Sequence, residues 1–194
     1  KLWWFNGLSR IVDSAPVIGD GKIYVATWTP GGDSDDRIRM EPFATALTTY
    51  DRNADGGIGQ DELPEGNAIR ERFFRIDLNQ NKQLDQVEWD KHTLVFARAQ
   101  NLAAAIRPGT QGLVPTENLH WSYSRGLPTV PSPVVYQGVM YMVKDGGIIT
   151  SLDASTGELL KQGRAVGPEN YYASIVAGDG KVYLISEGGV VTVL

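Results

Sequence analysis

Short apolar runs around glycine turns recur along the chain and predict β-hairpins. The runs that begin at Pro16, Pro133 and Ile175 each contain a turn ending in glycine, and a tyrosine lies three positions after that glycine. Two apolar runs on either side of such a turn are typical of a hairpin. Gly138 and Gly180, the second and third of these glycines, are 42 residues apart. That interval is typical of a four-stranded propeller blade, so the pattern predicts a series of antiparallel blades.

Between the first two hairpins the apolar spacing changes from that of a strand to that of a helix. Phe43, Leu47 and Tyr50 are three or four residues apart and predict one face of a helix. Further helices are predicted over Leu63–Ile76 and over Trp89–Ile106. We therefore expect a first blade part at residues 1–28, an inserted helical module with its linkers at 29–117, and continued, truncated blades at 118–194.

The predicted insertion contains one spacing of oxygen-bearing side chains twice. Residues 51–62 fill every required position of the calcium-loop pattern D-x-[DN]-x-[DN]-G-x5-E. Residues 77–88 repeat the pattern 26 positions later, with Lys82 in place of the glycine. This part of the sequence resembles a pair of EF-hands. The resemblance implies a short strand pairing between the loops, at Ile58 and Leu84.

Ca²⁺ is a hard cation that takes about six to eight oxygen ligands, and a loop with this alternating spacing turns them inward. Each loop brings three carboxylates together, and a divalent cation would relieve their repulsion. Position 9, Gly59 in the first loop, often acts through a water molecule. A side chain held at positive φ costs on the order of 1–2 kcal/mol, so Lys82 is expected to make the second site the weaker one. The candidate ligands for up to two Ca²⁺ ions are Asp51, Asn53, Asp55, Gly57 and Glu62, and then Asp77, Asn79, Asn81, Gln83, Asp85 and Glu88.

The hairpin segments carry a second, longer pattern. Its best copy, residues 132–160, reads S-P-V-V-x-x-G-x-x-Y…G-G-x-x-x-x-L-D-A-x-T-G-E-L-L. This pattern resembles the PQQ-like β-propeller repeat of quinoprotein dehydrogenases and of the BamB-type outer-membrane assembly factor. The resemblance implies four-stranded antiparallel β-propeller blades in a partial ring, interrupted by the all-α EF-hand pair. It also implies a periplasmic or extracellular bacterial location.

Other residues disfavour an enzyme that uses pyrroloquinoline quinone (PQQ). The tryptophan that usually follows the D-x-x-T-G-x-x-x stretch of the repeat is Lys161 here, and the chain has no cysteine that could cover a quinone. The sequence has no G-x-S-x-G elbow, P-loop or HExxH helix. His92 and His120 are the only histidines, and we expect both to be structural or surface residues. A quinoprotein dehydrogenase is kept as the alternative.

Composition narrows the choice of partners. The chain has 194 residues, of which 42 % are hydrophobic and 21 % charged, with a net charge of −5. A mildly acidic chain argues against a general nucleic-acid partner. No apolar run reaches the roughly 18 residues that a membrane span needs. No signal peptide is visible, but the abrupt start at Lys1-Leu2-Trp3-Trp4 fits the removal of one.

Together these patterns predict a calcium-binding, non-enzymatic propeller scaffold whose ions rigidify the insertion. A calcium sensor is a further alternative, although sensor grooves favour methionine and Met40 is the only methionine in the insertion. About two and a half blades cannot close a ring of the usual four to eight. We therefore expect a piece of a longer chain, or a protein partner or self-association that completes the propeller. The strand around Trp4 is a candidate for completing the last blade.

Overall fold

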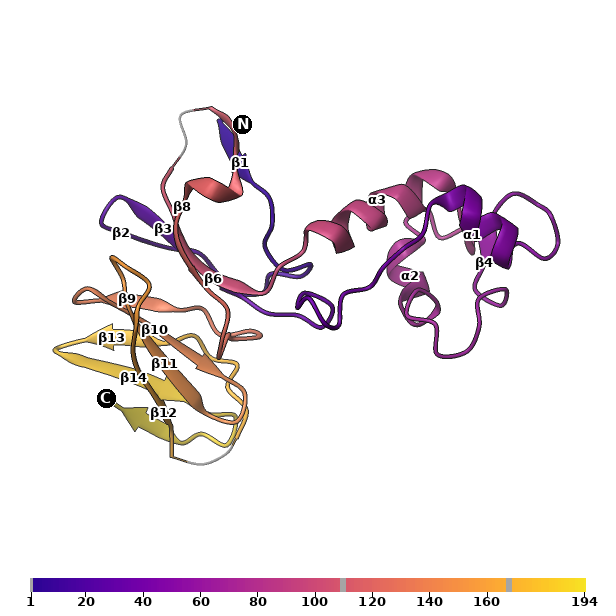
Figure 1. The fold of residues 1–194 in the computed structure, drawn as a ribbon. Coiled ribbons are helices and arrows are strands. Elements are labelled where there is room, and N and C mark those ends of the chain that lie inside the picture. The colour runs from indigo at the N-terminus through magenta and orange to yellow at the C-terminus, as the bar shows by residue number, and fades with distance from the viewer. Residues whose placement is uncertain (1, 109–110, 167–168) are drawn as a thin grey trace. The chain divides into compact units, whose positions relative to one another are not determined.

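The computed structural model describes residues 2–108, 111–166 and 169–194 (Figure 1). The chain divides into two compact units. One unit consists of residues 1–32 and 100–194, and the other of residues 33–99. The second unit therefore interrupts the sequence of the first, and it is shorter at both ends than the predicted insertion at 29–117.

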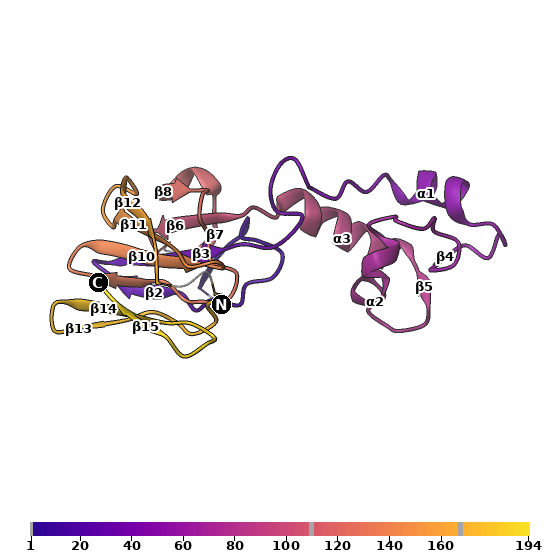
Figure 2. The same ribbon diagram turned by 90° about the horizontal axis from the view of Figure 1, so that it is seen from below.

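The first unit is built mostly of antiparallel sheets, as in partial propeller blades (Figure 2). Blade 1 has the strand order β2-β3-β6-β8, blade 2 the order β12-β11-β10-β9, and blade 3 the order β13-β14-β15. Strand β9 lies beside both β2 and β13, so the first strands of the three blades are neighbours. The strands are β2 (Val17–Gly19), β3 (Lys22–Thr27), β6 (Leu102–Ile106), β8 (Leu119–Tyr123), β9 (Val134–Tyr136), β10 (Val139–Lys144), β11 (Ile148–Asp153), β12 (Leu159–Arg164), β13 (Val176–Gly178), β14 (Lys181–Ile185) and β15 (Val191–Val193).

The N-terminal strand does not complete the last blade, so that prediction was wrong. Strand β1 (Trp3–Phe5) instead pairs in parallel with β7 (Gly112–Val114), which the 3₁₀ turn η2 (Thr116–Asn118) follows. Trp3 and Phe5 pack against the buried cluster that contains Val25 and Ala104. Partial burial of these two aromatic side chains against blade 1 favours this position of β1.

Each blade begins with a hairpin turn that holds two residues at positive φ. The φ angles are 47° and 69° at Asp20 and Gly21, 50° and 77° at Gln137 and Gly138, and 51° and 71° at Asp179 and Gly180. Two consecutive positive φ angles are the mark of a type I′ turn, whose twist matches that of the paired strands. The three hairpins predicted from the sequence are confirmed.

Strand β6 corrects the predicted helix over Trp89–Ile106. The helix α3 (Gln86–Arg98) ends earlier, and Leu102–Ile106 pairs with β3 on one side and β8 on the other. Alanine favours helices, which is why the prediction failed. In the structure all five residues of β6 are buried, with Ala103 and Ala105 in one core cluster and Ala104 in another. Small side chains suit a strand that is covered on both faces, so packing outweighed propensity.

Trp121 on β8 joins blade 1 to blade 2. Its indole N–H donates to the carbonyl oxygen of Ala154 at 3.0 Å, and the Tyr24 hydroxyl donates to the same oxygen at 3.1 Å. The indole ring covers Gly157, where a Cβ atom would lie 2.6 Å from the ring. Lys161 takes the place of Trp121 in blade 2. Trp121 pairs with Ala105 and Lys161 with Ser151, and in both blades the strand pairing shifts register directly next to that pair.

Asp153 holds the turn that lies under Trp121. Its carboxylate accepts the Ser155 hydroxyl at 2.6 Å, the Ser155 N–H at 2.8 Å and the Thr156 N–H at 2.9 Å. These hydrogen bonds, above all the one from the Ser155 hydroxyl, hold the pKa of Asp153 below its usual value. A lowered pKa stabilises the folded turn above the unfolded-state pKa, and this contribution is lost as the pH falls through the folded-state pKa.

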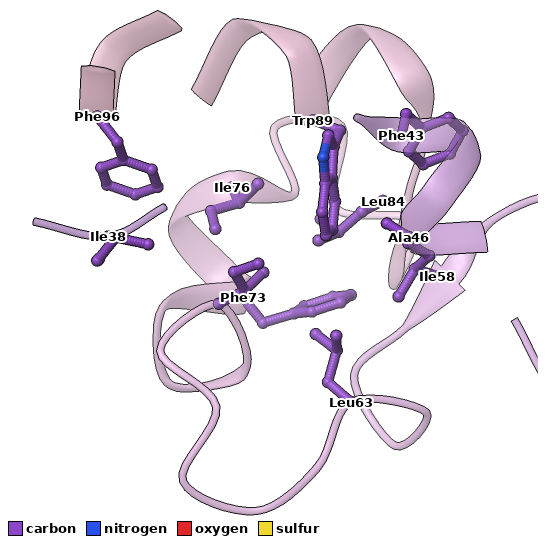
Figure 3. Packing of buried hydrophobic residues seen from close by; sticks show 11 residues of the cluster. Ile38, Phe43, Ala46, Ile58, Leu63, Phe73, Ile76, Leu84, Trp89 and Phe96 are labelled. Carbon is purple, nitrogen blue, oxygen red and sulfur yellow. The ribbon is translucent and has the colours of Figure 1, made fainter. Parts of the chain in front are cut away.

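The second unit is built around Trp89, which is fully buried (Figure 3). Its indole ring lies 5.9 Å from the ring of Phe43, and Leu84 and Ile58 lie in the same core. The elements of this unit are α1 (Phe43–Tyr50), β4 (Ile58–Gly59), η1 (Arg70–Arg72), α2 (Phe73–Ile76), β5 (Gln83–Leu84) and α3 (Gln86–Arg98).

In the described part of the chain no helix is long and apolar enough to cross a membrane.

The predicted helix over Leu63–Ile76 is much shorter in the structure. Only the 3₁₀ turn η1 and the four-residue helix α2 form. Gly66 has a φ of 75°, which interrupts any helix that starts at Pro64. The side chain of Asn67 then accepts the N–H of Ile69 at 2.8 Å and begins a new turn, as helix-capping residues do.

Candidate metal site

The first candidate loop, residues 51–62, folds around its own acidic side chains. The carboxylate of Asp51 accepts the N–H of Gly56 at 3.0 Å. The carboxylate of Glu62, the last residue of the loop, accepts the N–H of Arg52 at 2.9 Å and that of Gly59 at 2.7 Å. Asp51 therefore bonds to the middle of the loop, and Glu62 bonds to both the middle and the start of the loop, which closes it.

The second candidate loop, residues 77–88, repeats this arrangement. Asp77 accepts the N–H of Lys82 at 2.9 Å, as Asp51 accepts that of Gly56. Glu88 accepts the N–H of Leu78 at 2.7 Å. Glu88 and Asp85 also form a capping box at the start of α3. The same hydrogen-bond plan thus occurs in both loops, 26 residues apart.

The remaining predicted side-chain ligands follow one rule in both loops. Each accepts the N–H of the residue two positions further along, which fixes the side chain against the loop backbone. These bonds run from Asp55 N to Asn53 Oδ1 at 2.9 Å, Gly57 N to Asp55 Oδ1 at 3.0 Å, Asn81 N to Asn79 Oδ1 at 2.9 Å and Gln83 N to Asn81 Oδ1 at 2.9 Å.

The two loops are joined by the pairing of β4 with β5. Ile58 pairs with Leu84, and Gly59 pairs with Gln83. Ile58 and Leu84 are both fully buried, so the pair is anchored in the core of the unit (Figure 3). The strand pairing predicted at these two residues is confirmed.

The donor set suits a hard cation, although the structure contains no ready-made group of acidic residues. In the described residues no three His, Asp or Glu side chains form a group that could hold a metal ion. Each loop supplies oxygen atoms only, from three carboxylates and from amides, and this is the chemistry that Ca²⁺ prefers. None of these six carboxylates forms an ion pair with a described Lys or Arg side chain. Ca²⁺ coordination therefore remains a prediction that the chemistry of the donor set favours.

The loops differ in how deeply their carboxylates are buried. Asp77 and Glu88 of the second loop are only 6 % and 3 % exposed. Asp51 and Glu62, at the same places in the first loop, are partly exposed. Removing a carboxylate from water is costly unless its charge is compensated, so the second loop has the greater need for a cation. Burial thus favours tighter Ca²⁺ binding by the second loop, whereas Lys82 was expected to weaken it.

Lys82 is strained, and its replacement tests the cost. Its φ is 69°, while Gly56 at the same place in the first loop has a φ of 86°. We expect Lys82→Gly to raise the free energy of unfolding of residues 33–99 by up to about 1 kcal/mol, because glycine adopts this φ freely. Gly56→Ala is the matched control and should lower it by about 1 kcal/mol, because alanine is strained at a φ of 86° while its Cβ would meet no atom within 4 Å. Urea unfolding monitored by hydrogen exchange measures both, and a loss of stability in Lys82→Gly would contradict the strain argument.

The sequence did not reveal that one side chain crosses between the loops. Gln83 is at position 7 of the second loop, where the calcium-loop pattern uses only the backbone carbonyl as ligand. In the structure its side-chain amide also donates to the Asp55 carboxylate of the first loop. Contacts over 28 residues cannot be read from spacing within one motif.

The two histidines show no catalytic arrangement. His92 Nδ1 is 3.0 Å from the carbonyl oxygen of Glu88, and its ring lies 6.1 Å from that of Phe96 on the same helix. His120 lies at the edge of a surface cavity of about 340 Å³, together with Arg107 and Glu117. Neither contact pairs a histidine with a nucleophile.

No family model matches the sequence, and no curated protein matches it either. Among solved structures the chain is similar to BamB from Moraxella catarrhalis, with 15 % identity over 48 % of this chain and 28 % of that chain and a TM-score of 0.36. It is also similar to the quinohemoprotein alcohol dehydrogenase from Comamonas testosteroni, with 15 % identity over 95 % of this chain and 18 % of that chain and a TM-score of 0.46. A third similar structure is quinohemoprotein alcohol dehydrogenase ADHIIG from Pseudomonas putida HK5. It is 14 % identical over 99 % of this chain and 20 % of that chain, with a TM-score of 0.48.

The chain spans less than a third of the length of each of these proteins. At such identities the comparison concerns only the course of the backbone. The chemistry of the two loops in residues 33–99 has to be judged from the residues of this chain.

Proposed function

We propose that residues 33–99 form a paired EF-hand module that binds up to two Ca²⁺ ions within a non-enzymatic, PQQ-like propeller scaffold. Asp51, Asn53, Asp55 and Glu62, with the carbonyl of Gly57, would hold one ion. The second would be held by Asp77, Asn79, Asn81, Asp85 and Glu88, with the carbonyl of Gln83. The observation that carries the proposal is the shared hydrogen-bond plan of two loops whose position-8 residues pair as β4 and β5.

Burial supports the proposal independently of the loop pattern. Asp77 and Glu88 are at least nine-tenths buried and form no ion pair with a described cation. Backbone N–H groups stabilise these carboxylates only in part, because two like charges in one loop still repel. A divalent cation would remove that repulsion, and its binding free energy would then stabilise the folded unit.

A structural role for the ions is favoured over a sensor role by a segment that we call the strap, residues 37–41. Arg37 donates to the carbonyl oxygens of Ala97 and Ala99 at the end of α3, at 3.2 and 2.9 Å. The carbonyl of Glu41 accepts the Trp89 indole N–H at 2.7 Å, and Ile38 is buried in the same core. A sensor must expose an apolar groove when it binds Ca²⁺. Here the strap packs its own Ile38 and Met40 on the core of the unit, where a sensor would have to open a groove.

A calorimetric Ca²⁺ titration of the metal-stripped chain tests the proposal. We expect two ions to bind, and Glu62→Gln to weaken the first site by on the order of 100-fold or more, because one charged bidentate ligand is lost. Glu88→Gln should do the same at the second site. Glu65→Gln, an exposed change just outside the first loop, is the matched control and should bind like the parent chain.

Each outcome of this titration has a distinct meaning. No heat of binding in the parent chain would overturn the calcium assignment. Equal loss at both sites in Glu65→Gln would show that the effect is not local. An increase in the fluorescence of an apolar-surface dye when Ca²⁺ is added would replace the structural role by a sensor role.

The scaffold part of the proposal concerns the blades. Their interfaces hold buried apolar clusters, while the described residues show no nucleophile–base pair at either histidine. We accordingly assign the blades a role in protein association, with a partner or further copies of the chain completing the propeller. A periplasmic or extracellular location fits this assignment, because extracellular Ca²⁺ sites can work at affinities of roughly 10⁻⁴–10⁻³ M.

A further inference from the structure

One side chain connects the two candidate loops directly. Gln83 lies on β5 in the second loop, and its Nε2 atom donates to Oδ2 of Asp55 in the first. The same Oδ2 atom accepts the side-chain N–H of Asn53 at 2.9 Å, while Oδ1 of Asp55 accepts the N–H of Gly57 at 3.0 Å. A carboxylate offers about four lone-pair directions, so three donors leave one direction for a cation.

Gly57 makes room for this crossing. A Cβ atom at residue 57 would lie 3.3 Å from Cβ, Cδ and Oε1 of Gln83, which is closer than most real contacts. Gly57 is itself buried, and Gln83 is partly buried. The glutamine side chain therefore lies flat on the backbone of the first loop, held between that backbone and Asp55.

We propose that Gln83 is a positioning residue that couples the two loops by fixing the Asp55 ligand of the first. This inference rests on the proposed Ca²⁺ binding. Gln83 has two roles at once: its side chain orients a ligand of the first site, and its backbone carbonyl is a ligand of the second. An ion that orders the second loop also holds the Gln83 side chain in place, which prepares Asp55 for the first ion.

The β4–β5 pairing joins the backbones of the two loops, and the Gln83 side chain adds a contact that has no counterpart in the first loop. The residue at the same place in the first loop is Gly57, which has no side chain that could contact the second loop. The energetic effect is nevertheless reciprocal. If the second-site ion raises the affinity of the first site by some factor, the first-site ion raises the affinity of the second site by the same factor. Residues that orient metal ligands without touching the metal typically change affinity by about 10- to 100-fold.

Gln83→Met tests the proposal, because methionine keeps the length of the side chain and removes its N–H donor. We expect the first-site affinity for Ca²⁺ to fall about 10-fold and the positive cooperativity between the two ions to decrease, because only the coupling through the β4–β5 pairing is left. Hydrogen exchange in the metal-stripped chain should show faster exchange at Asp55 and Gly57. Gln86→Met is the matched control: the same substitution on the exposed start of α3, beside the non-ligand Asp90, should change neither quantity.

The titration separates this proposal from the one on which it rests. If the parent chain binds no Ca²⁺, the calcium assignment fails and the coupling fails with it. If the parent binds two ions and Gln83→Met binds them with the same affinity and cooperativity, only the coupling is overturned. Unchanged exchange at Asp55 and Gly57 in the variant would likewise overturn it, since Gln83 would then not hold the first loop.

Discussion

Replacing Trp121 by alanine is expected to lower the free energy of unfolding of the blade unit by about 3–5 kcal/mol. The side chain is 8 % exposed, packs 6.0 Å from the ring of Tyr24 and covers Gly157. Its removal leaves a cavity between blades 1 and 2 that the glycine beneath cannot fill. The carbonyl of Ala154 keeps its bond from Tyr24, so the cost comes mainly from lost packing. Hydrogen exchange along a urea series, analysed peptide by peptide, measures the two units separately.

Two further variants make this result specific. Trp121→Phe keeps most of the ring contact and loses only one hydrogen bond, so it should cost clearly less than alanine. Tyr172→Ala removes an aromatic side chain that is 54 % exposed and should stay within about 0.5 kcal/mol of the parent chain. If Trp121→Ala were as stable as Tyr172→Ala, the indole would not be what joins the two blades.

The hairpins were predictable because their information is local. An aspartate or glutamine followed by glycine, between two apolar runs, specifies a type I′ turn within a few residues. Strand β6 was not predictable in the same way. Its three alanines favour a helix when taken alone. Only the strands on either side and the side chains on both faces make Leu102–Ile106 a strand, and these come from distant parts of the chain.

In the candidate site, too, the local features were predictable and the long-range contacts were not. The positions of the oxygen donors and the pairing of Ile58 with Leu84 follow from spacing inside one repeated motif. The strap and the Gln83 side chain do not, because each makes its contact with a segment outside its own motif. The depth at which Glu88 is buried was also beyond the sequence, since burial is a property of the folded unit.

Trp89 offers the sharpest test of how Ca²⁺ and folding are linked in the second unit. It is fully buried, packs against Phe43, and donates to the strap at Glu41. Trp89→Ala is expected to cost about 3–5 kcal/mol, from the lost volume and from the unpaired carbonyl of Glu41. A unit of this size has a total stability of only about 3–10 kcal/mol. Without bound Ca²⁺ we expect the unit to lie near the lower end of this range, so the metal-stripped variant should be largely unfolded in residues 33–99, while the blade unit keeps its exchange protection.

Ca²⁺ should then refold the variant, because a ligand that binds only the folded state stabilises it in proportion to the logarithm of its concentration. At about 1,000 times the dissociation constant this gain is about 4 kcal/mol per site, so one filled site matches the loss and two exceed it. Far-ultraviolet circular dichroism, followed as Ca²⁺ is added, measures the recovery. Leu94→Ala on the same helix, at a side chain that is 52 % exposed, is the control and should be folded without the ion. If Trp89→Ala stayed unfolded at saturating Ca²⁺ while Leu94→Ala bound it, the ions would not be what stabilises this unit.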